Sequence, residues 1–544
     1  MPTRFLKLIN SWELIRKPLV LIVSAIILSF FGVYLFSQTR VSGDAASHLL
    51  LAISPILKIG SPYKDFWDIK PPVLPLSLYL WNSLFGFGIL SIRIFNIIIA
   101  ALVTAVSYFV YKRVFQTPVF ETIFLFTVII VLSPILNSMM IPTEMLGLLL
   151  SMVALLVLIS FRKDFPKFYL SGLLFFAASQ AKEPFTLTVL AMLPVFFGSL
   201  LKKGFSGLFK NLAQFLLGVL TSFVGIYIYL ASFAAIGSYL EVFKYKQAFY
   251  PFSFERLSQN FLPGIYSVER TFTEFSHGFS ILILFAALSF YLVNKFKKTV
   301  AFNLRSSQLI TKSLIVADSE KIIKYAVFLY ALGSFLGFGL GGSFGSHYLI
   351  QVVVPFYIIT GLVVSYLYNN ASFLFNKPKP YFYTVLFVVG FSVIVIMPKR
   401  PYLSSYLPRT TSFSMTDDVI GFEKRITELT TKDQCVLSVY GWGVSENYLY
   451  SMRRPCTRFF LANIVWEDWQ KKEYAKSVIE NPPAVIVYQT SGADLDIRKF
   501  ESEVINLSKI IKNCYTQDVV EKVIYIPKTS NIDGLRNCIK VNSI

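Results

Sequence analysis

The chain has 544 residues, of which 55% are hydrophobic and 15% charged, and it carries a formal net charge of +20. Together with a mean hydropathy of +0.59, this composition excludes an ordinary soluble protein and predicts a polytopic α-helical membrane protein. Basic loops that face anionic lipid on the cytoplasmic side account for much of the charge, so we expect no nucleic-acid partner.

Apolar segments able to cross a hydrocarbon core of roughly 30 Å recur along the chain up to residue 397. The basic N-terminus precedes an apolar run without a nearby cleavage site, which indicates an uncleaved first helix. Lys and Arg concentrate in alternate connections, which places the N-terminus in the cytoplasm; an odd number of spans then puts the C-terminus outside the cell membrane. The eleven predicted spans are 19–36, 88–111, 119–136, 143–161, 167–181, 185–201, 208–236, 278–295, 325–341, 348–368 and 381–397.

Two long connections, 37–87 and 237–277, are expected on the outer side. Within the first, 44–58 and 74–86 are apolar but too short to span, so we predict helices that lie at the outer interface. The second connection is rich in aromatic residues and is a candidate entrance for an acceptor. Together with the spans, these loops form a predicted membrane domain of residues 1–398.

A change of composition after residue 398 predicts a small α/β domain outside the membrane, residues 399–544. The stretches "QCVLSVYGWG", "PAVIVYQT" and "KVIYIPK" are typical of short buried strands. Helices are expected near 416–430 and 498–512.

All four cysteines of the chain lie in this C-terminal domain, which favours disulfides in an oxidising compartment. A zinc site is disfavoured because neither a CxxC spacing nor a histidine accompanies them. The spacing does not determine the connectivity. Of the three possible pairings we favour Cys435 with Cys456 and Cys514 with Cys538.

Ionisable and polar residues gather at the predicted outer boundary of the membrane. Each has a structural alternative: Asp44 and Glu144 could cap helices, Lys182 could reach lipid phosphate, and His347 could simply support a helix start. Asp44 and His48 share one face if their segment is helical. Their concentration in one layer indicates a common cavity. The candidate residues are Asp44, His48, Asp65, Asp68, Lys70, Glu144, Lys182, Glu183, His347 and Tyr348.

The location of these residues separates two classes of function. Transporters place ionisable groups near the bilayer midplane, often within duplicated halves. Here the midplane stretches carry almost no charge and no halves match, which favours an enzyme acting on a lipid-borne substrate. A flippase or transporter of lipid-linked sugars, or a non-catalytic subunit of cell-envelope assembly, remains the alternative.

Several motifs occur in an order that resembles the GT-C membrane glycosyltransferases, in particular the group similar to protein O-mannosyltransferases and lipid A aminoarabinose transferases. They are "GDAASHLLLA", "GSPYKDFWDIKPPVLPLSLYL", "PTEMLGLLLSM", "QAKEPFTLTVLAMLP" and "GSHYLIQVVVPF", and the resemblance spans about residues 20–370. It implies a GT-C fold, a polyprenyl-phosphate-linked sugar as donor, and a lipid, glycan or protein acceptor at the outer face.

The resemblance also implies individual roles. Asp44 matches the catalytic acidic residue at the start of the first outer loop, and Glu144 matches the acidic residue of the second. Lys70 of "KPP" and Lys182 match lysines that bind the donor phosphate. Several relatives have two adjacent acids, or an acid followed closely by arginine, whereas Asp44 is followed by Ala-Ala-Ser-His. The role of His48 is therefore open.

The expected chemistry fits these residue types. Fixed cations at Lys70 and Lys182 would stabilise the negative charge of the leaving phosphate. Asp44 would accept the proton of the attacking hydroxyl. A single displacement inverts the anomeric carbon, whereas a double displacement needs a second carboxylate, for which Glu144 is the candidate. We expect no cofactor and no obligatory metal, although Asp44 and Glu144 could share a divalent ion.

Overall fold

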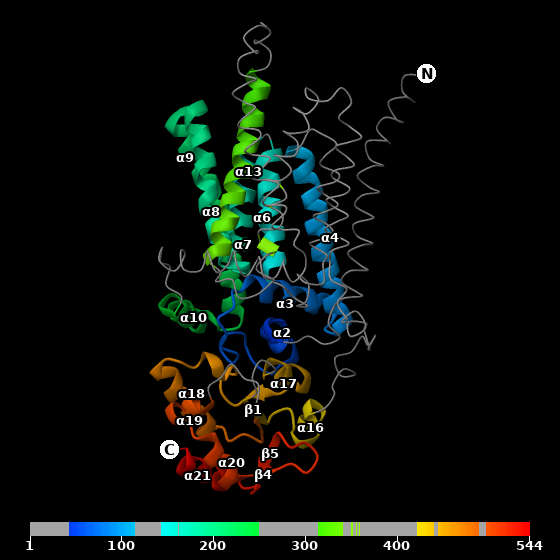
Figure 1. Cartoon of the computed structure of the whole chain (residues 1–544), viewed down its shortest axis with the longest axis vertical. Coiled ribbons are helices and arrows are strands. Elements are labelled where there is room, and N and C mark those ends of the chain that lie inside the picture. The colour runs from blue at the N-terminus through cyan, green and yellow to red at the C-terminus, as the bar shows by residue number, and fades with distance from the viewer. Residues whose placement is uncertain are drawn as a thin grey trace, which may run out of the picture.

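The computed structural model describes residues 43–114, 143–161, 163–249, 314–340, 350, 351, 355, 358, 422–439, 444–488 and 497–543. Long helices form a bundle at one end of this part, and a small α/β unit lies at the other (Figure 1). Three shorter helices lie between them: α2 (Gly43–Leu57), α3 (Val73–Phe85) and α10 (Ile236–Phe249).

The bundle supports the prediction of a helical membrane protein. Three of its described helices are long and apolar enough to cross a membrane, over Leu90–Val114, Thr143–Ser160 and Gly204–Ser232. The predicted spans 19–36, 119–136, 278–295 and 381–397, and most of 348–368, lie outside the described residues. The bundle helices are α4 (Ile89–Val114), α6 (Thr143–Ser160), α7 (Asp164–Ala181), α8 (Phe185–Met192), α9 (Phe197–Ser232) and α13 (Leu314–Leu340).

The predicted span 185–201 differs from the observed structure. Helix α8 ends at Met192 and is followed by a 3-10 turn, Leu193–Phe196. Pro194 lies in this turn and has no N–H to donate, which interrupts the helical hydrogen bonds. The segment is therefore too short to cross the membrane as one straight helix.

Helices α7 and α9 approach each other closely because glycines face the partner backbone. A Cβ at Gly172 would lie 2.1 Å from the carbonyl oxygen of Phe215, and one at Gly218 would lie 2.0 Å from that of Tyr169. Such contact distances require residues without side chains, as is common between membrane helices. This contact holds the middle of α7 against α9.

The two short helices predicted at 44–58 and 74–86 are present as α2 and α3. The Pro71-Pro72 pair precedes α3, where the missing proline N–H groups cost nothing in the first helical turn. Helix α2 is enclosed by protein rather than laid on an open surface, since its residues from Ala45 to Ile53 are at most 2% exposed. It packs against α3 on one side and against the α/β unit on the other.

The α/β unit contains a five-stranded sheet in the order β2-β1-β3-β5-β4. Strand β1 pairs in parallel with β2 and β3, and β5 pairs antiparallel with β3 and β4. The three predicted strand segments form β1, β3 and β5, which are the inner strands. The strands are β1 (Cys435–Val439), β2 (Arg454–Pro455), β3 (Val485–Tyr488), β4 (Tyr515–Gln517) and β5 (Ile524–Pro527).

Six helices lie around this sheet in the described part of the unit. The predicted helix 498–512 is divided in two because the side chain of Asn506 accepts a hydrogen bond from the backbone N–H of Lys509 and starts a new helix there. The helices are α16 (Phe422–Leu429), α17 (Val444–Ser451), α18 (Asp468–Glu480), α19 (Ile497–Glu503), α20 (Leu507–Cys514) and α21 (Ile532–Asn542).

Two disulfides cross-link the unit, and the favoured pairing is confirmed. Cys435 at the start of β1 is bonded to Cys456, just after β2. Cys514 at the end of α20 is bonded to Cys538 in α21. The first bond fixes the segment after β2 to β1, an inner strand of the sheet.

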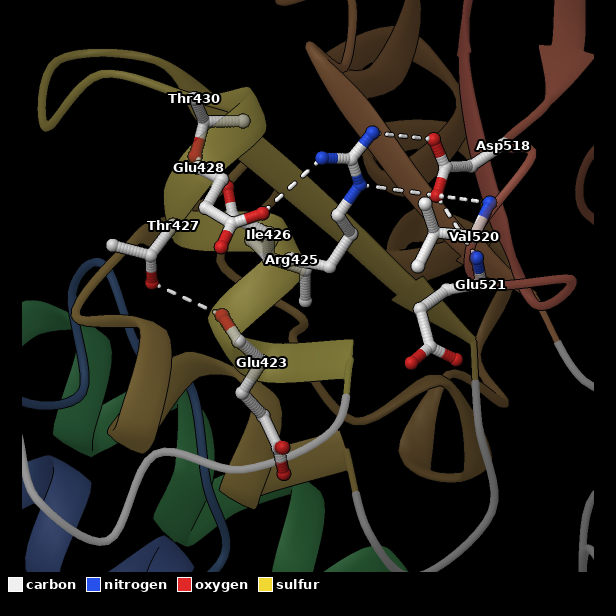
Figure 2. A network of polar contacts seen from close by, with 9 residues as sticks. All are labelled: Glu423, Arg425, Ile426, Thr427, Glu428, Thr430, Asp518, Val520 and Glu521. Carbon is white, nitrogen blue, oxygen red and sulfur yellow. Dashed lines mark hydrogen bonds and ion pairs between the residues drawn. The ribbon is translucent and has the colours of Figure 1, made fainter.

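A polar network joins α16 to the turn between β4 and β5 (Figure 2). Arg425 contacts Asp518 through two nitrogens, at 2.9 and 3.1 Å. The same carboxylate accepts hydrogen bonds from the backbone N–H groups of Val520 and Glu521. The contact with Arg425 lowers the pKa of Asp518 to about 2. This turn is therefore held to α16 by a charged carboxylate.

Candidate functional site

The site begins at α2, which carries Asp44 in its first turn. One turn later, the hydroxyl of Ser47 donates a hydrogen bond to Oδ2 of Asp68. Asp68 is fully buried, and His48 is 2% exposed. The Ser47 contact joins the helix bearing Asp44 to the loop bearing Asp68. The side chain of Asp44 lies outside the described residues.

The loop between α2 and α3 has a specific backbone path that positions Lys70. Tyr63 adopts a left-handed conformation with φ of 60°, which is rare for an aromatic residue. Its hydroxyl donates a 2.9 Å hydrogen bond to the carbonyl oxygen of Lys70. Asp65 accepts a 2.7 Å hydrogen bond from the backbone N–H of Ser61. Asp65 thus stabilises the loop, whereas the structure places Asp68 and Lys70 toward the other charged groups.

Glu144 and Lys182 form an ion pair at the end of the bundle that faces the α/β unit. Helix α7 ends before Lys182 because Pro184 disfavours a helical conformation of Glu183. The Nζ atom of Lys182 lies 2.9 Å from Oε1 of Glu144, and the two side chains are 14% and 2% exposed. In the structure Lys182 therefore faces Glu144. This argues against the alternative that Lys182 only extends toward lipid phosphate.

A third lysine, Lys246 of α10, joins this group and was missed by the sequence analysis. Its ammonium donates a 2.8 Å hydrogen bond to the carbonyl oxygen of Ile69. It also forms an ion pair with Glu183. Helical spacing could have identified it: Val242 and Tyr245 are buried on α10, and Lys246 lies one turn from Val242 on the same face.

The three lysines Lys70, Lys182 and Lys246, called here the lysine cluster, influence one another electrostatically. Burial, and then the charges of Lys182 and Lys70, lower the pKa of Lys246 to about 7, while the charge of Asp68 opposes the shift. Like charges at close range repel, and burial removes the water that would screen them. An anion between these lysines would relieve this repulsion.

The structure brings together five of the predicted candidates and leaves others apart. Asp68, Lys70, Glu144, Lys182 and Glu183 lie around the lysine cluster, and Ser47 links them to the helix of Asp44 and His48. Asp65 stabilises its own loop. His347 and Tyr348 lie outside the described residues.

The lysine cluster is chemically suited to an anion with several oxygen atoms. Ammonium groups make short, charge-assisted hydrogen bonds with phosphate and carboxylate oxygens. The cluster comes from the loop before α3, the end of α7 and α10, which lie where the bundle meets the α/β unit (Figure 1). Across the described ranges, no three side chains of His, Cys, Asp or Glu converge as metal ligands.

The described fold is that of a helical membrane protein with an α/β unit beyond one end of its bundle. No protein-family model matches the chain, and no curated protein sequence matches it.

Solved structures similar to this chain include two of an archaeal oligosaccharyltransferase. One is the archaeal oligosaccharyltransferase AglB from Archaeoglobus fulgidus in complex with an inhibitory peptide and a dolichol-phosphate, with a TM-score of 0.49, 10% sequence identity, and coverage of 95% of this chain and 75% of that one. The other is the Archaeoglobus fulgidus oligosaccharyltransferase tethered to an acceptor peptide containing the NVT sequon, with a TM-score of 0.47, 10% identity and the same coverage, 95% and 75%.

Proposed function

We propose that the protein is an integral-membrane glycosyltransferase that moves a sugar from a polyprenyl-phosphate-linked donor to a lipid, glycan or protein acceptor on the outer face of the membrane. The observation that carries this proposal is the lysine cluster at the end of an apolar helical bundle. The motif resemblance supports the same reading, because it independently assigns two of the three lysines to the donor phosphate.

The location of the lysine cluster favours a lipid-borne anion. Charged groups next to membrane spans are costly to bury and are usually functional. A polyprenyl chain can lie along the apolar helices while its phosphate remains at their end. The three cations then supply the positive charge that a departing phosphate requires.

In the proposed reaction, the acceptor oxygen forms a bond to the anomeric carbon as the bond from that carbon to the phosphate oxygen breaks. The electron pair of the broken bond stays on the phosphate, which Lys70, Lys182 and Lys246 hold. The hydroxyl proton passes to Asp44. One displacement gives inversion, and no metal is needed because the lysines stabilise the leaving charge.

The carboxylates of the site have a second proposed role. Glu144 and Glu183 neutralise Lys182 and Lys246 when no donor is bound. The donor phosphate replaces these carboxylates. Asp68 holds the helix of Asp44 next to the lysines through its hydrogen bond from Ser47. His48, His347 and Tyr348 are proposed to line the pocket for the sugar or the acceptor.

A transfer assay with the purified protein in lipid tests this proposal. Lys246→Gln is expected to raise the KM for a polyprenyl-phosphate sugar about 10- to 100-fold, the cost of one charge-assisted contact. Lys244→Gln is the matched control, because Lys244 is exposed on the same helix. Asp44→Asn should abolish transfer, and EDTA should leave the wild-type rate unchanged.

The alternative outcomes are distinct. Movement of lipid-linked sugar across sealed vesicles without a new glycosidic bond would identify a transporter instead. If Lys246→Gln and Lys244→Gln changed the KM equally, Lys246 would not belong to the phosphate site. Full activity of Asp44→Asn would remove Asp44 as the base.

A further inference from the structure

We propose that the α/β unit maintains the geometry of the phosphate site, and that Trp67 and Arg458 are positioning residues that hold the segments of Lys70 and Lys246 in place. The inference rests on the proposed function. It concerns four rings that we call the aromatic junction: Trp67, Tyr245, Phe459 and Trp469.

The aromatic junction joins three parts of the chain around one buried side chain. Trp67 is fully buried. Its ring centroid lies 5.1 Å from that of Tyr245, 5.4 Å from Phe459 and 6.4 Å from Trp469, all in edge-to-face arrangements. Its backbone N–H donates a 2.8 Å hydrogen bond to the carbonyl oxygen of Arg458. Ring packing of this kind fixes orientation as well as distance.

The junction lies directly beside two members of the lysine cluster. Trp67 precedes Lys70 by three residues, and Tyr245 immediately precedes Lys246. Between them, the ammonium of Lys246 is hydrogen-bonded to the carbonyl oxygen of Ile69. A displacement of the α/β unit would therefore move both lysine-bearing segments together.

Polar contacts add a second connection between α10 and the α/β unit. One nitrogen of Arg458 lies 2.8 Å from Glu241 of α10, and another lies 2.6 Å from Glu473 of α18. The hydroxyl of Tyr245 donates a 3.3 Å hydrogen bond to the carbonyl oxygen of Ile464. Arg458 thus bridges the two parts, although an ion pair that is partly exposed contributes less than the buried rings.

The α/β side of the junction is itself anchored. Cys456 is bonded to Cys435 of β1, two residues before Arg458. The backbone N–H of Cys456 donates a 3.1 Å hydrogen bond to the carbonyl oxygen of Val436 in the same strand. The segment that receives Trp67 is therefore attached to β1, an inner strand of the sheet. A fixed anchor of this kind is what a positioning role requires, because catalysis and phosphate binding depend on sub-ångström placement.

The test measures binding of a polyprenyl phosphate, without any transfer step, to the full-length protein in lipid nanodiscs. The variant Glu241→Gln with Tyr245→Phe removes the ion pair and the tyrosine hydrogen bond between α10 and the α/β unit but keeps the ring. We expect a rise of about three- to tenfold in Kd. Glu473→Gln is the matched control, because it removes a carboxylate from the same arginine within the α/β unit. We expect its Kd to stay within twofold of the wild-type value.

A pH series supplies a readout that general instability would not change. Lys246 faces the charges of Lys70, Lys182, Asp68 and Glu183, and burial holds down its pKa. Loosening the aromatic junction admits water, which weakens the effect of burial and raises the pKa of Lys246. The loss of binding at alkaline pH should therefore move to higher pH in the double variant. Trp67→Leu should produce the same shift with a larger rise in Kd.

The outcomes separate the two proposals. If the wild-type protein binds polyprenyl phosphate and the double variant binds it equally well with an unchanged pH series, the positioning role is wrong and the proposed function stands. Equal losses in the double variant and in Glu473→Gln would also overturn it. If the wild-type protein does not bind polyprenyl phosphate, the proposed function fails and this inference fails with it.

Discussion

Lys246 donates a 2.8 Å hydrogen bond to the carbonyl oxygen of Ile69, which lies 177 residues earlier in the chain. The contact joins α10 to the loop that precedes α3, and both segments carry a lysine of the cluster. Their meeting brings Lys70 and Lys246 into one cluster.

The titration of Lys246 should have opposite effects on donor binding and on folding. Because the pKa of Lys246 is lowered from 10.5 to about 7, the folded protein loses this proton near neutral pH while the unfolded chain keeps it to about 10.5. The unfolded state therefore binds more protons between these values, and stability rises with pH across the window. Donor affinity falls over the same window because the cation is lost.

Lys246→Met should remove both trends. Thermal unfolding and polyprenyl-phosphate binding, each measured from pH 6 to about 10, would show them. A wild-type protein whose donor affinity is constant over this range would contradict the assignment.

Glu144 and Lys182 should behave as a coupled pair. Lys182→Gln leaves a carboxylate that is 2% exposed without its cation, and breaking such a buried pair costs about 3–5 kcal/mol of unfolding free energy. The double variant with Glu144→Gln should recover most of this stability but not donor binding. Chemical unfolding and binding of polyprenyl phosphate would separate the two effects.

Glu144→Gln alone distinguishes the two roles considered for Glu144. If Glu144 only neutralises Lys182, the variant should bind polyprenyl phosphate more tightly and retain transfer. If Glu144 acts on the reacting atoms, transfer should be lost while binding persists. An unchanged Kd together with full transfer would exclude both roles.

The two disulfides should differ in function although they close loops of similar size, with sequence separations of 21 and 24 residues. Removing either pair by substitution with serine should destabilise the α/β unit by about 3 kcal/mol. Only Cys435→Ser with Cys456→Ser loosens the segment of Arg458, so only this variant should weaken polyprenyl-phosphate binding. Equal polyprenyl-phosphate binding by both variants would show that the Cys435–Cys456 bond does not affect the lysine cluster.

Asp518 should control the acid stability of the α/β unit. Its folded pKa is depressed to about 2, chiefly by Arg425, so the stability it contributes is present above its ordinary pKa of 3.8 and is lost as the pH falls toward 2. Asp518→Asn should flatten the dependence of unfolding on pH in this window. Near-ultraviolet circular dichroism of the full chain would follow it, with Asp533→Asn on the exposed face of α21 as the control.

Much of the fold follows from local sequence patterns. Val73–Phe85 and Gly43–Leu57 are helices within two residues of the expected bounds, and the ends of the first are marked by Pro72 and Gly86. The inner strands of the α/β unit are apolar and bounded by polar turns, and they were predicted from composition. The outer strands β2 and β4 have two and three residues, too few for a periodic signal.

The site was predicted less completely, for physical reasons. Glu144 and Lys182 were recognised as charges at helix ends, but their pairing depends on how α6 and α7 pack. Lys246 was overlooked because its neighbours suggested an aromatic surface, and its role depends on Ile69 and Glu183, which are distant in sequence. Trp67 belongs to one of the motifs, but its contacts with Tyr245 and Phe459 depend on the fold, because these residues are distant in sequence.

The ion pairs that Lys182 and Lys246 form with Glu144 and Glu183 bear on the end of the catalytic cycle. In the proposed reaction, the polyprenyl phosphate left after transfer carries more negative charge than the donor did, so a site made only of cations would retain its product. Two carboxylates within reach of the same ammonium groups would compete with that product as it moves. Under the proposed function, the resting ion pairs thus favour release, and they let one site combine strong stabilisation of the leaving group with repeated turnover.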